Sequence, residues 1–297
     1  MNDIAVNSFK AWMLASRPKT LTGAAVPVMI GLSMAYATLG ADGFKVLPAV
    51  LCMLFAFVMQ IDANFVNDYF DFLRGNDDES RLGPLRACSQ GWITAPAMRM
   101  ALLVTTVLAC CIGLPLVLFG GFEMLLVGLA CVLFCFLYTT SLSYHGLGDL
   151  LVLMFFGLVP VCVTYYIQTG DITPDVVLAS LSCGLVIDTL LIVNNYRDID
   201  NDIRAGKRTL IVRLGARKGL KAYWVAGVVP LLLSGICFAL HGHLMAALLP
   251  VVYMVFHIMT YNKMVRINKG RALNSVLADT ARNILIYGLC VSAGMLF

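Results

Sequence analysis

Long apolar runs separated by short polar segments dominate the chain. We predict about nine membrane-spanning helices from these runs, at roughly residues 21–39, 46–66, 100–119, 124–142, 148–168, 176–195, 222–240, 245–262 and 275–296. A helix crosses the apolar core of a bilayer with about 20 residues, and each run is close to that length. Residues 1–20, which include "FKAWMLASRPKT", are expected to form an interfacial segment with Trp12 at headgroup depth.

The composition agrees with this pattern. Hydrophobic residues make up 60% of the chain, charged residues only 13%, and the mean hydropathy is +0.86. In soluble domains about a quarter of the residues are charged. We therefore predict an all-α, polytopic integral membrane protein with residues 1–297 as a single domain. The ten cysteines are scattered through apolar segments, and we interpret them as small core residues rather than metal ligands.

The basic residues predict the orientation. Alternate loops carry nearly all of them, in four groups: Lys10 to Lys19, Arg74 to Arg99, Arg197 to Lys221, and Lys263 to Arg271. Because basic loops face the cytoplasm, we expect these ends in the cytoplasm and the chain in the plasma (inner) membrane. The net charge of +4 then belongs to loops beside anionic headgroups, and nucleic acid is not an expected partner.

Two acidic segments stand at the ends of apolar spans on this side. They read "NFVNDYFDFLRGNDD" (residues 64–78) and "NNYRDIDNDIRAGKR" (residues 194–208). Helical spacing places three polar side chains of each segment on one face: Asn64, Asp68 and Asp71, then Asn194, Asp198 and Asp202. Clustered carboxylates repel one another unless a cation is present, and Mg²⁺ binds carboxylates together with phosphate oxygens. We predict that the two faces meet and hold magnesium ions against a diphosphate.

The candidate site residues follow from this hypothesis. The candidate metal ligands are Asn64, Asp68, Asp71, Asp77, Asn194, Asp198 and Asp202, of which Asp68, Asp71, Asp198 and Asp202 are the candidate catalytic residues. Whether Asp77 completes the first metal site stays open, since a solvated loop explains Asp77 and Asp78 equally well. Basic side chains are expected to bind the remaining diphosphate oxygens: Arg81, Arg86, Arg197, Lys207 and Arg208.

The two segments also resemble a known family. "NDYFD" and "NNYRDIDND" are similar to the two Asp-rich motifs of the UbiA superfamily of intramembrane prenyltransferases. "SRPKTLTGAAVPVMIG", "GPLRA", "YHGLGDLLVLMFFGLVPV" and "LNSVLADTAR" resemble its 1,4-dihydroxy-2-naphthoate branch, and the likeness covers nearly the whole chain. Two positions depart from the pattern. Gly75 stands where the superfamily often has a further Asp, and Asp149 replaces a Glu that is usual in the branch.

The resemblance implies a helical bundle with a central cavity and a magnesium-dependent enzyme. Such enzymes transfer a polyprenyl group from its diphosphate to an aromatic ring; in this branch 1,4-dihydroxy-2-naphthoate loses CO₂ and yields demethylmenaquinone. It also suggests Tyr138, His145 and Asp149 as acceptor-binding residues. Another acceptor, such as 4-hydroxybenzoate, stays open. A membrane transporter is the alternative from another class, because intramembrane carboxylates also mark ion pathways.

Overall fold

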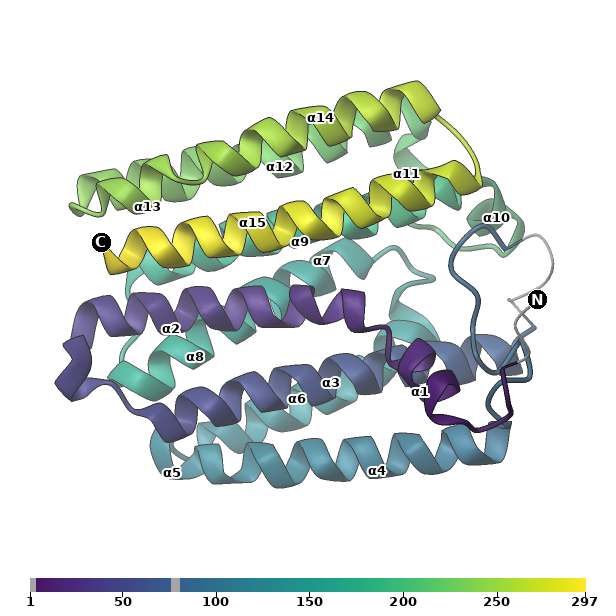
Figure 1. The fold of residues 1–297 in the computed structure, drawn as a ribbon, viewed down its shortest axis with the longest axis horizontal. Helices are drawn as coiled ribbons and strands as arrows, with labels where there is room; N and C mark the ends of the chain where they lie inside the picture. Colours follow the sequence, from purple (N-terminus) through teal and green to yellow (C-terminus); the bar gives the residue numbers. More distant parts are fainter. Residues whose placement is uncertain (1–3, 76–80) are drawn as a thin grey trace.

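The computed structural model describes residues 4–75 and 81–297. Within these ranges the chain is helical without a strand, and nine helical segments are long and apolar enough to cross a membrane. The prediction of an all-α protein with about nine spans is therefore confirmed. Figure 1 shows the helices running nearly side by side along one direction, with the loops gathered at the two ends.

The spans are built from long helices, several of them interrupted. The longer helices are α1 (Phe9–Ser16), α2 (Leu21–Gly43), α3 (Val46–Leu73), α4 (Ala95–Gly113), α6 (Glu123–Leu137), α8 (Val159–Thr169), α9 (Pro174–Arg197), α12 (Ala216–Leu240), α14 (Val251–Ile267) and α15 (Asn274–Leu296). The short helices are α5 (Val117–Gly120), α7 (Gly148–Val152), α10 (Ile199–Arg204), α11 (Leu210–Leu214) and α13 (Leu244–Leu248). Turns of 3₁₀ or π-helix connect several of these: η1 (Pro18–Thr20), η2 (Leu114–Leu116), η3 (Tyr138–Leu142), η4 (Leu153–Leu158) and η5 (Arg271–Leu273).

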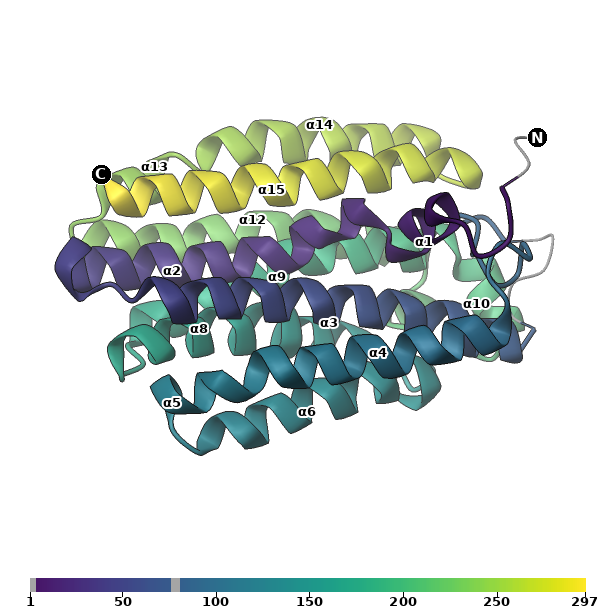
Figure 2. The ribbon, with the colours of Figure 1, turned by 60° about the horizontal axis from the view of Figure 1, so that its bottom comes forward.

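Helix α9 lies at the centre of the bundle. It packs against α12, α15, α8 and α2 (Figures 1 and 2), and two thirds of its most apolar stretch is buried within the protein. The turn η4 packs closely against α9 at Gly157. A Cβ atom added to Gly157 would lie 2.6 Å from the carbonyl oxygen of Ser180 and 2.9 Å from Gly184 Cα, so a larger residue would clash with α9 there. Small residues permit such close approach between membrane helices. The peripheral helices α4 and α6 instead expose leucines, as a lipid-facing surface requires.

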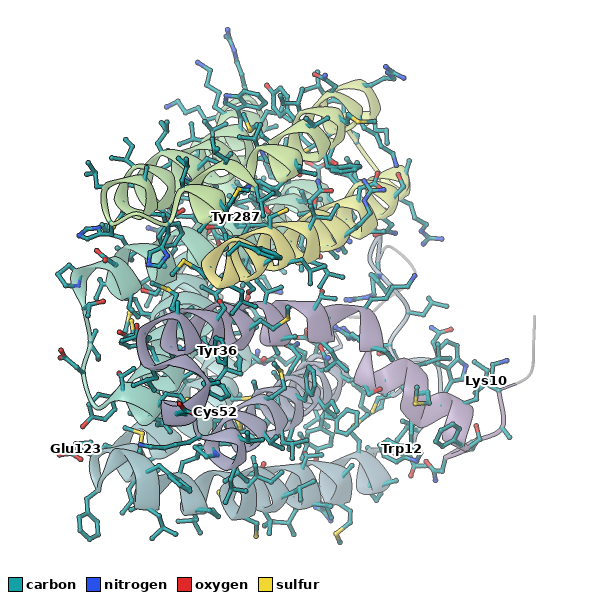
Figure 3. All side chains as sticks on the ribbon, turned by 60° about the vertical axis from the view of Figure 1, so that its left-hand side comes forward. Lys10, Trp12, Tyr36, Cys52, Glu123 and Tyr287 are labelled. Atoms are coloured by element: carbon teal, nitrogen blue, oxygen red, sulfur yellow. The ribbon has the colours of Figure 1, made fainter. Side chains whose placement is uncertain are left out.

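The N-terminal segment forms a helix of its own. Arg17 has a left-handed backbone conformation (φ +48°) and separates α1 from the first span. Ala11 and Ala15 are buried against α3, while Phe9 is 81% exposed. Figure 3 shows Lys10 and Trp12 on this helix, at the opposite end of the molecule from Glu123. The interfacial position of this segment stays a prediction.

The predicted end of the second span differs from the structure. That span was expected to end at residue 66, but α3 continues to Leu73, so residues 64–73 of the first acidic segment are helical. The limits predicted for two later spans that follow one another, 124–142 and 148–168, agree with the structure: the π-helical turn η3 extends the first of them through Leu142, and α7 begins at Gly148. Arg74 stabilises this extension, because its guanidinium donates to the carbonyl oxygens of Thr139 (2.8 Å) and Thr140 (2.5 Å).

Candidate active site

The two acidic segments line one polar cavity of about 410 Å³ at the end of the bundle that carries α10 and α11 (Figure 1). The first segment contributes Asn67 and Asp71 from α3. The second contributes Asn194 and Asn195 from α9, Asp198 from the helix junction, and Asn201 and Asp202 from α10. The two segments therefore meet in space, as the sequence predicted, although not every predicted residue faces the cavity.

Asn64 and Asp68 point away from this cavity. The Asn64 amide donates to the Ser16 carbonyl oxygen and to Thr20 Oγ1, both at 2.9 Å. Asp68 is 1% exposed, and its carboxylate accepts the backbone N–H groups of Ala87 and Cys88, both at 2.9 Å. The structure contradicts the predicted grouping of these two residues with Asp71 on one cavity-facing side.

The helical period explains the difference. Asn67 and Asp71 are four residues apart and share the face toward the cavity, while Asn64 and Asp68 share a face about 60° away. By sequence spacing alone, either pair could face the cavity, and only the positions of the neighbouring helices decide that Asn67 and Asp71 do. Asn67 is the ligand candidate that the sequence reasoning missed; its i, i+4 spacing to Asp71 was the available signal.

Asp71 forms a buried ion pair at the cavity wall. Its Oδ2 lies 2.6 Å from Arg86 Nη1, and that guanidinium also donates to the Asn67 carbonyl oxygen. The Asn67 side chain is fixed in turn, because its Oδ1 accepts a hydrogen bond from Thr139 Oγ1 at 2.8 Å. Arg86 is only 8% exposed. The first segment thus presents one carboxylate whose charge a neighbouring arginine already balances.

The second segment contains its own balancing cation. Arg197, 4% exposed at the end of α9, donates through Nε and Nη2 to both carboxylate oxygens of Asp198, at 2.8 and 2.5 Å. It also donates to Asn194 Oδ1 at 2.6 Å and to Asn274 Oδ1 at 2.7 Å. Arg197 was predicted to bind diphosphate, but its donors are engaged within the protein and it does not line the cavity.

Asp202 is a buried carboxylate that lines the polar cavity. Its pKa is raised from the ordinary 3.8 to about 6, mainly by burial. The negative charges of Asp198 and Asp71 act on this pKa in the same direction, while Lys207 and Arg197 oppose the rise. This mutual influence shows that the three carboxylates share one electrostatic environment. A bound cation would relieve their repulsion.

The predicted diphosphate-binding residues separate into two groups. Arg81, Arg86 and Lys207 line the polar cavity, whereas Arg197 and Arg208 do not. The Lys207 ammonium also lies 5.0 Å from the centre of the Tyr144 ring. The Arg208 N–H donates to the Tyr144 carbonyl oxygen at 2.9 Å, so this residue joins the two loops.

The three predicted acceptor residues also lie in different surroundings. Tyr138 lines the polar cavity and a second, larger cavity. His145 is exposed and bonded to the Ser141 carbonyl oxygen at 3.0 Å, and it lines neither cavity. Asp149 lines neither, and its Oδ1 is buried without a hydrogen-bond partner among the described residues. Of the three, only Tyr138 is placed to contact a molecule in either space.

The larger cavity is apolar and has a volume of about 680 Å³. Its walls include Phe55, Met59, Val132 and Phe155. It shares six lining residues with the polar cavity, so the two spaces adjoin: Asn67, Arg81, Arg86, Tyr138, Leu191 and Asn194. The arrangement suits an amphipathic ligand with a charged head and a long apolar tail.

The oxygen atoms at the polar cavity fit a hard divalent cation. Three carboxylates and several side-chain amides supply oxygen donors, which is the ligand chemistry of Mg²⁺. Asp77, the seventh predicted metal ligand, lies outside the described residues, as does Asp78. The donor set therefore supports a divalent cation held by Asn67, Asp71, Asn194, Asp198 and Asp202.

A membrane-spanning helical bundle with a polar, charged cavity beside an apolar one defines a class of membrane protein that can hold an amphipathic molecule. The model of the UbiA prenyltransferase family matches residues 24–281, and the chain belongs to this family. Solved UbiA structures share the fold. A UbiA homologue from Aeropyrum pernix K1 superposes with a TM-score of 0.69 at 13% identity, over 93% of this chain and 96% of that one. A homologue from Archaeoglobus fulgidus bound to DMAPP and Mg²⁺ gives 0.62 at 13% identity, over 95% and 99%.

Curated relatives are more similar in sequence. The 1,4-dihydroxy-2-naphthoate octaprenyltransferase of Haemophilus influenzae is 38% identical over 71% of each chain. The Escherichia coli enzyme of the same name is 36% identical over 82% of this chain and 81% of its own. That of Mycobacterium tuberculosis is 32% identical over 98% of both. The predicted family membership is confirmed, and the chain is a prenyltransferase of the UbiA family.

Proposed function

We propose that this protein transfers a polyprenyl group from polyprenyl diphosphate to 1,4-dihydroxy-2-naphthoate, with loss of CO₂ and diphosphate, to form the hydroquinone of demethylmenaquinone, which a separate oxidation converts to the quinone. The observation that supports it most is the pair of adjoining cavities, one polar with charged side chains of both signs and one apolar, with Tyr138 lining both. The names of the curated relatives support the acceptor.

The diphosphate occupies the polar cavity in this proposal. Mg²⁺ bound among the carboxylates of Asp71, Asp198 and Asp202 would act as a Lewis acid that stabilises the leaving diphosphate. Arg81, Arg86 and Lys207 line the same space and supply further positive charge to its oxygens. Two of these carboxylates are paired with arginine, Asp71 with Arg86 and Asp198 with Arg197, and these pairs balance part of the negative charge of the cavity.

The prenyl chain extends into the apolar cavity, and its reacting carbon lies at the junction. The apolar walls contribute by excluding water, which would otherwise capture the electron-poor allylic carbon as the diphosphate departs. The acceptor ring approaches at the same junction beside Tyr138 and Leu191. The ring carbon that carries the carboxylate forms the new bond, and loss of CO₂ restores aromaticity.

The position in the membrane belongs to the same proposal. Because the basic loops lie at the same end of the bundle as the polar cavity, this end faces the cytoplasm in our proposal, and the chain resides in the plasma (inner) membrane. A soluble acceptor then enters from the cytoplasm, while the prenyl diphosphate enters from the lipid.

A reconstitution experiment tests the function. The purified protein in lipid is given Mg²⁺, a polyprenyl diphosphate, and either 1,4-dihydroxy-2-naphthoate labelled in its carboxyl carbon or 4-hydroxybenzoate. We expect the prenylated naphthohydroquinone (together with the quinone that air oxidation forms from it) and labelled CO₂ in equal amounts, and no product without Mg²⁺. Preferential consumption of 4-hydroxybenzoate would overturn the acceptor assignment, and no product from either acceptor would overturn prenyl transfer.

A further inference from the structure

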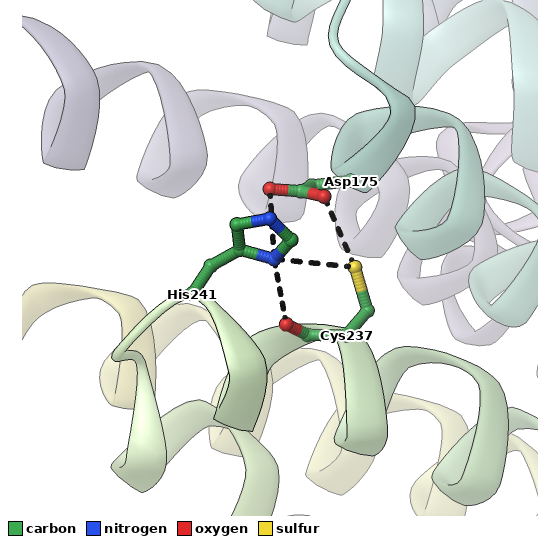
Figure 4. A group of neighbouring side chains, drawn as sticks. All are labelled: Asp175, Cys237 and His241. Atoms are coloured by element: carbon green, nitrogen blue, oxygen red, sulfur yellow. Dashed lines mark hydrogen bonds and ion pairs between the residues drawn. The ribbon is translucent and has the colours of Figure 1, made fainter.

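A cluster of side chains that could bind a metal ion lies at the opposite end of the bundle from the polar cavity. Asp175 is in the first turn of α9, and Cys237 and His241 are one turn apart where α12 ends (Figure 4). Nineteen residues of α9 separate Asp175 from Asn194, which is about 29 Å at 1.5 Å per residue. This cluster is therefore separate from the candidate active site.

The three side chains form a compact triangle. Cys237 Sγ lies 3.1 Å from Asp175 Oδ1, His241 Nδ1 lies 3.4 Å from Asp175 Oδ2, and Sγ lies 3.9 Å from Nδ1. Ligand bonds of about 2.0–2.3 Å in a tetrahedral zinc site place neighbouring ligand atoms about 3.3–3.6 Å apart. The two distances to Asp175 run to different oxygens of its carboxylate. With one ligand atom taken from each residue, all three lie within 4.8 Å of one another, so rotations of these side chains would bring them onto one face of such a tetrahedron.

The ligand atoms of this cluster differ in kind from those of the polar cavity. A thiolate, an imidazole nitrogen and a carboxylate are typical ligands of Zn²⁺, whereas Mg²⁺ prefers oxygen alone. The i, i+4 spacing on α12 directs Cys237 and His241 to the same side. The side chain of His241 is 56% exposed, so a fourth position is accessible to water.

We propose that Asp175, Cys237 and His241 bind a zinc-like divalent cation, with a solvent ligand in the fourth position. The Cys237 thiol, which now donates to Asp175, releases its proton to water as the metal–sulfur bond forms. The Nδ1–H of His241 now donates to the Cys237 carbonyl oxygen at 2.9 Å; on binding, Nδ1 coordinates and the ring proton resides on Nε2. No electron is transferred.

Such a site would join the beginning of α9 to the end of α12. These two helices pack along their lengths, and Cys237 is only 7% exposed. Because the metal binds the folded arrangement and not the separated helices, its main effect is on stability. Prenyl transfer should continue without it, and this separates the proposal from the function proposed above.

Cobalt absorption tests the site directly. The metal-stripped protein is titrated with Co²⁺ in excess Mg²⁺, because only a thiolate ligand gives sulfur-to-cobalt charge-transfer absorption in the near ultraviolet. We expect saturation at one equivalent. Cys237→Ser should abolish this absorption, and His241→Gln or Asp175→Asn should weaken Co²⁺ binding about tenfold or more. The double variant Cys110→Ser/Cys111→Ser, which removes two exposed cysteines, is the matched control and should keep the full signal.

Thermal unfolding supplies the second measurement. Zn²⁺ should raise the unfolding temperature of the wild-type protein and of the control, but not that of Cys237→Ser. The three variants should retain Mg²⁺-dependent prenyl transfer, which shows that they fold. Absence of stoichiometric absorption in the wild type, its persistence in Cys237→Ser, or its loss in the control would each overturn the proposal.

Discussion

The two acidic segments use similar residues in different ways. In the first, Asp68 accepts two backbone N–H groups outside the cavity, and Asp71 is balanced by Arg86 from the connection between α3 and α4. In the second, Asp198 is balanced by the adjacent Arg197, and Asp202 projects from a separate short helix. The first segment depends on contacts from elsewhere in the chain, while the second organises much of its own charge.

This difference shows how one helical motif can serve folding and chemistry together. Adjacent residues on a helix point about 100° apart, so Asp68 fixes the loop of residues 81–94 while its neighbour Asn67 lines the cavity. That loop carries Arg86, which returns to Asp71. By fixing this loop, Asp68 thus positions Arg86, whose guanidinium balances the charge of Asp71 at the cavity.

The largest expected effect is at Asp202. We expect Asp202→Asn to lower kcat by about 100-fold or more, because it removes negative charge from the proposed cation site. The unfolding temperature should not fall, since the substitution also removes a poorly solvated carboxylate. Product formation and thermal unfolding, measured side by side, check this. Wild-type turnover would exclude Asp202 from the catalytic group.

Asp71→Asn sharpens the comparison within the first segment. We expect a loss in kcat of about 30-fold or more, because the cavity loses a carboxylate and Arg86 loses its ion-pair partner. The measurement is the dependence of rate on Mg²⁺ concentration, which should shift to higher values. An unchanged Mg²⁺ dependence would leave Asp71 with a purely structural role.

Asp68→Asn should act mainly on stability. An amide can accept only one of the two backbone N–H groups that the carboxylate now accepts, and its NH₂ faces the other donor. We expect the free energy of unfolding to fall by about 1.5–3 kcal/mol. At a temperature where the variant stays folded, turnover should remain within about tenfold of the wild type. Inactivity of a stably folded Asp68→Asn protein would restore the original prediction of a metal ligand.

Arg86→Lys should have a smaller effect. Lysine keeps the charge but cannot reproduce the planar guanidinium that contacts both Asp71 and the Asn67 carbonyl oxygen. We expect the KM for the prenyl diphosphate to rise about 5- to 10-fold and kcat to change less. Steady-state kinetics at saturating acceptor measure this. The same KM as in the wild type would remove Arg86 from the diphosphate site.

The smallest effect is expected at His145. This exposed side chain lines neither cavity, so His145→Ala should change the KM for the acceptor by less than about twofold. Tyr138→Ala is the contrasting variant, because Tyr138 lines both cavities, and its KM for the acceptor should rise. A large rise in His145→Ala would return this residue to the acceptor site.

Much of the fold could be predicted because lipid imposes a simple rule. Each span must be apolar for about 20 residues, so the number and approximate limits of the spans are written in the chain itself. The meeting of the two acidic segments was also predictable, since both stand at span ends on the same side. The choice between Asn64 and Asn67 was not, because both are i, i+4 partners of an aspartate.

The sequence by itself therefore determined the helical class, the approximate number of spans and the two acidic segments at the same end of the bundle. Tertiary structure determined which side of α3 faces the cavity, and it places Arg197 so that its guanidinium donates hydrogen bonds to Asp198, Asn194 and Asn274. It also brought Asp175 to a cysteine and a histidine that lie more than sixty residues away. The physical reason is that helical periodicity fixes directions only relative to the helix itself, whereas the packing of other helices determines what lies in each direction.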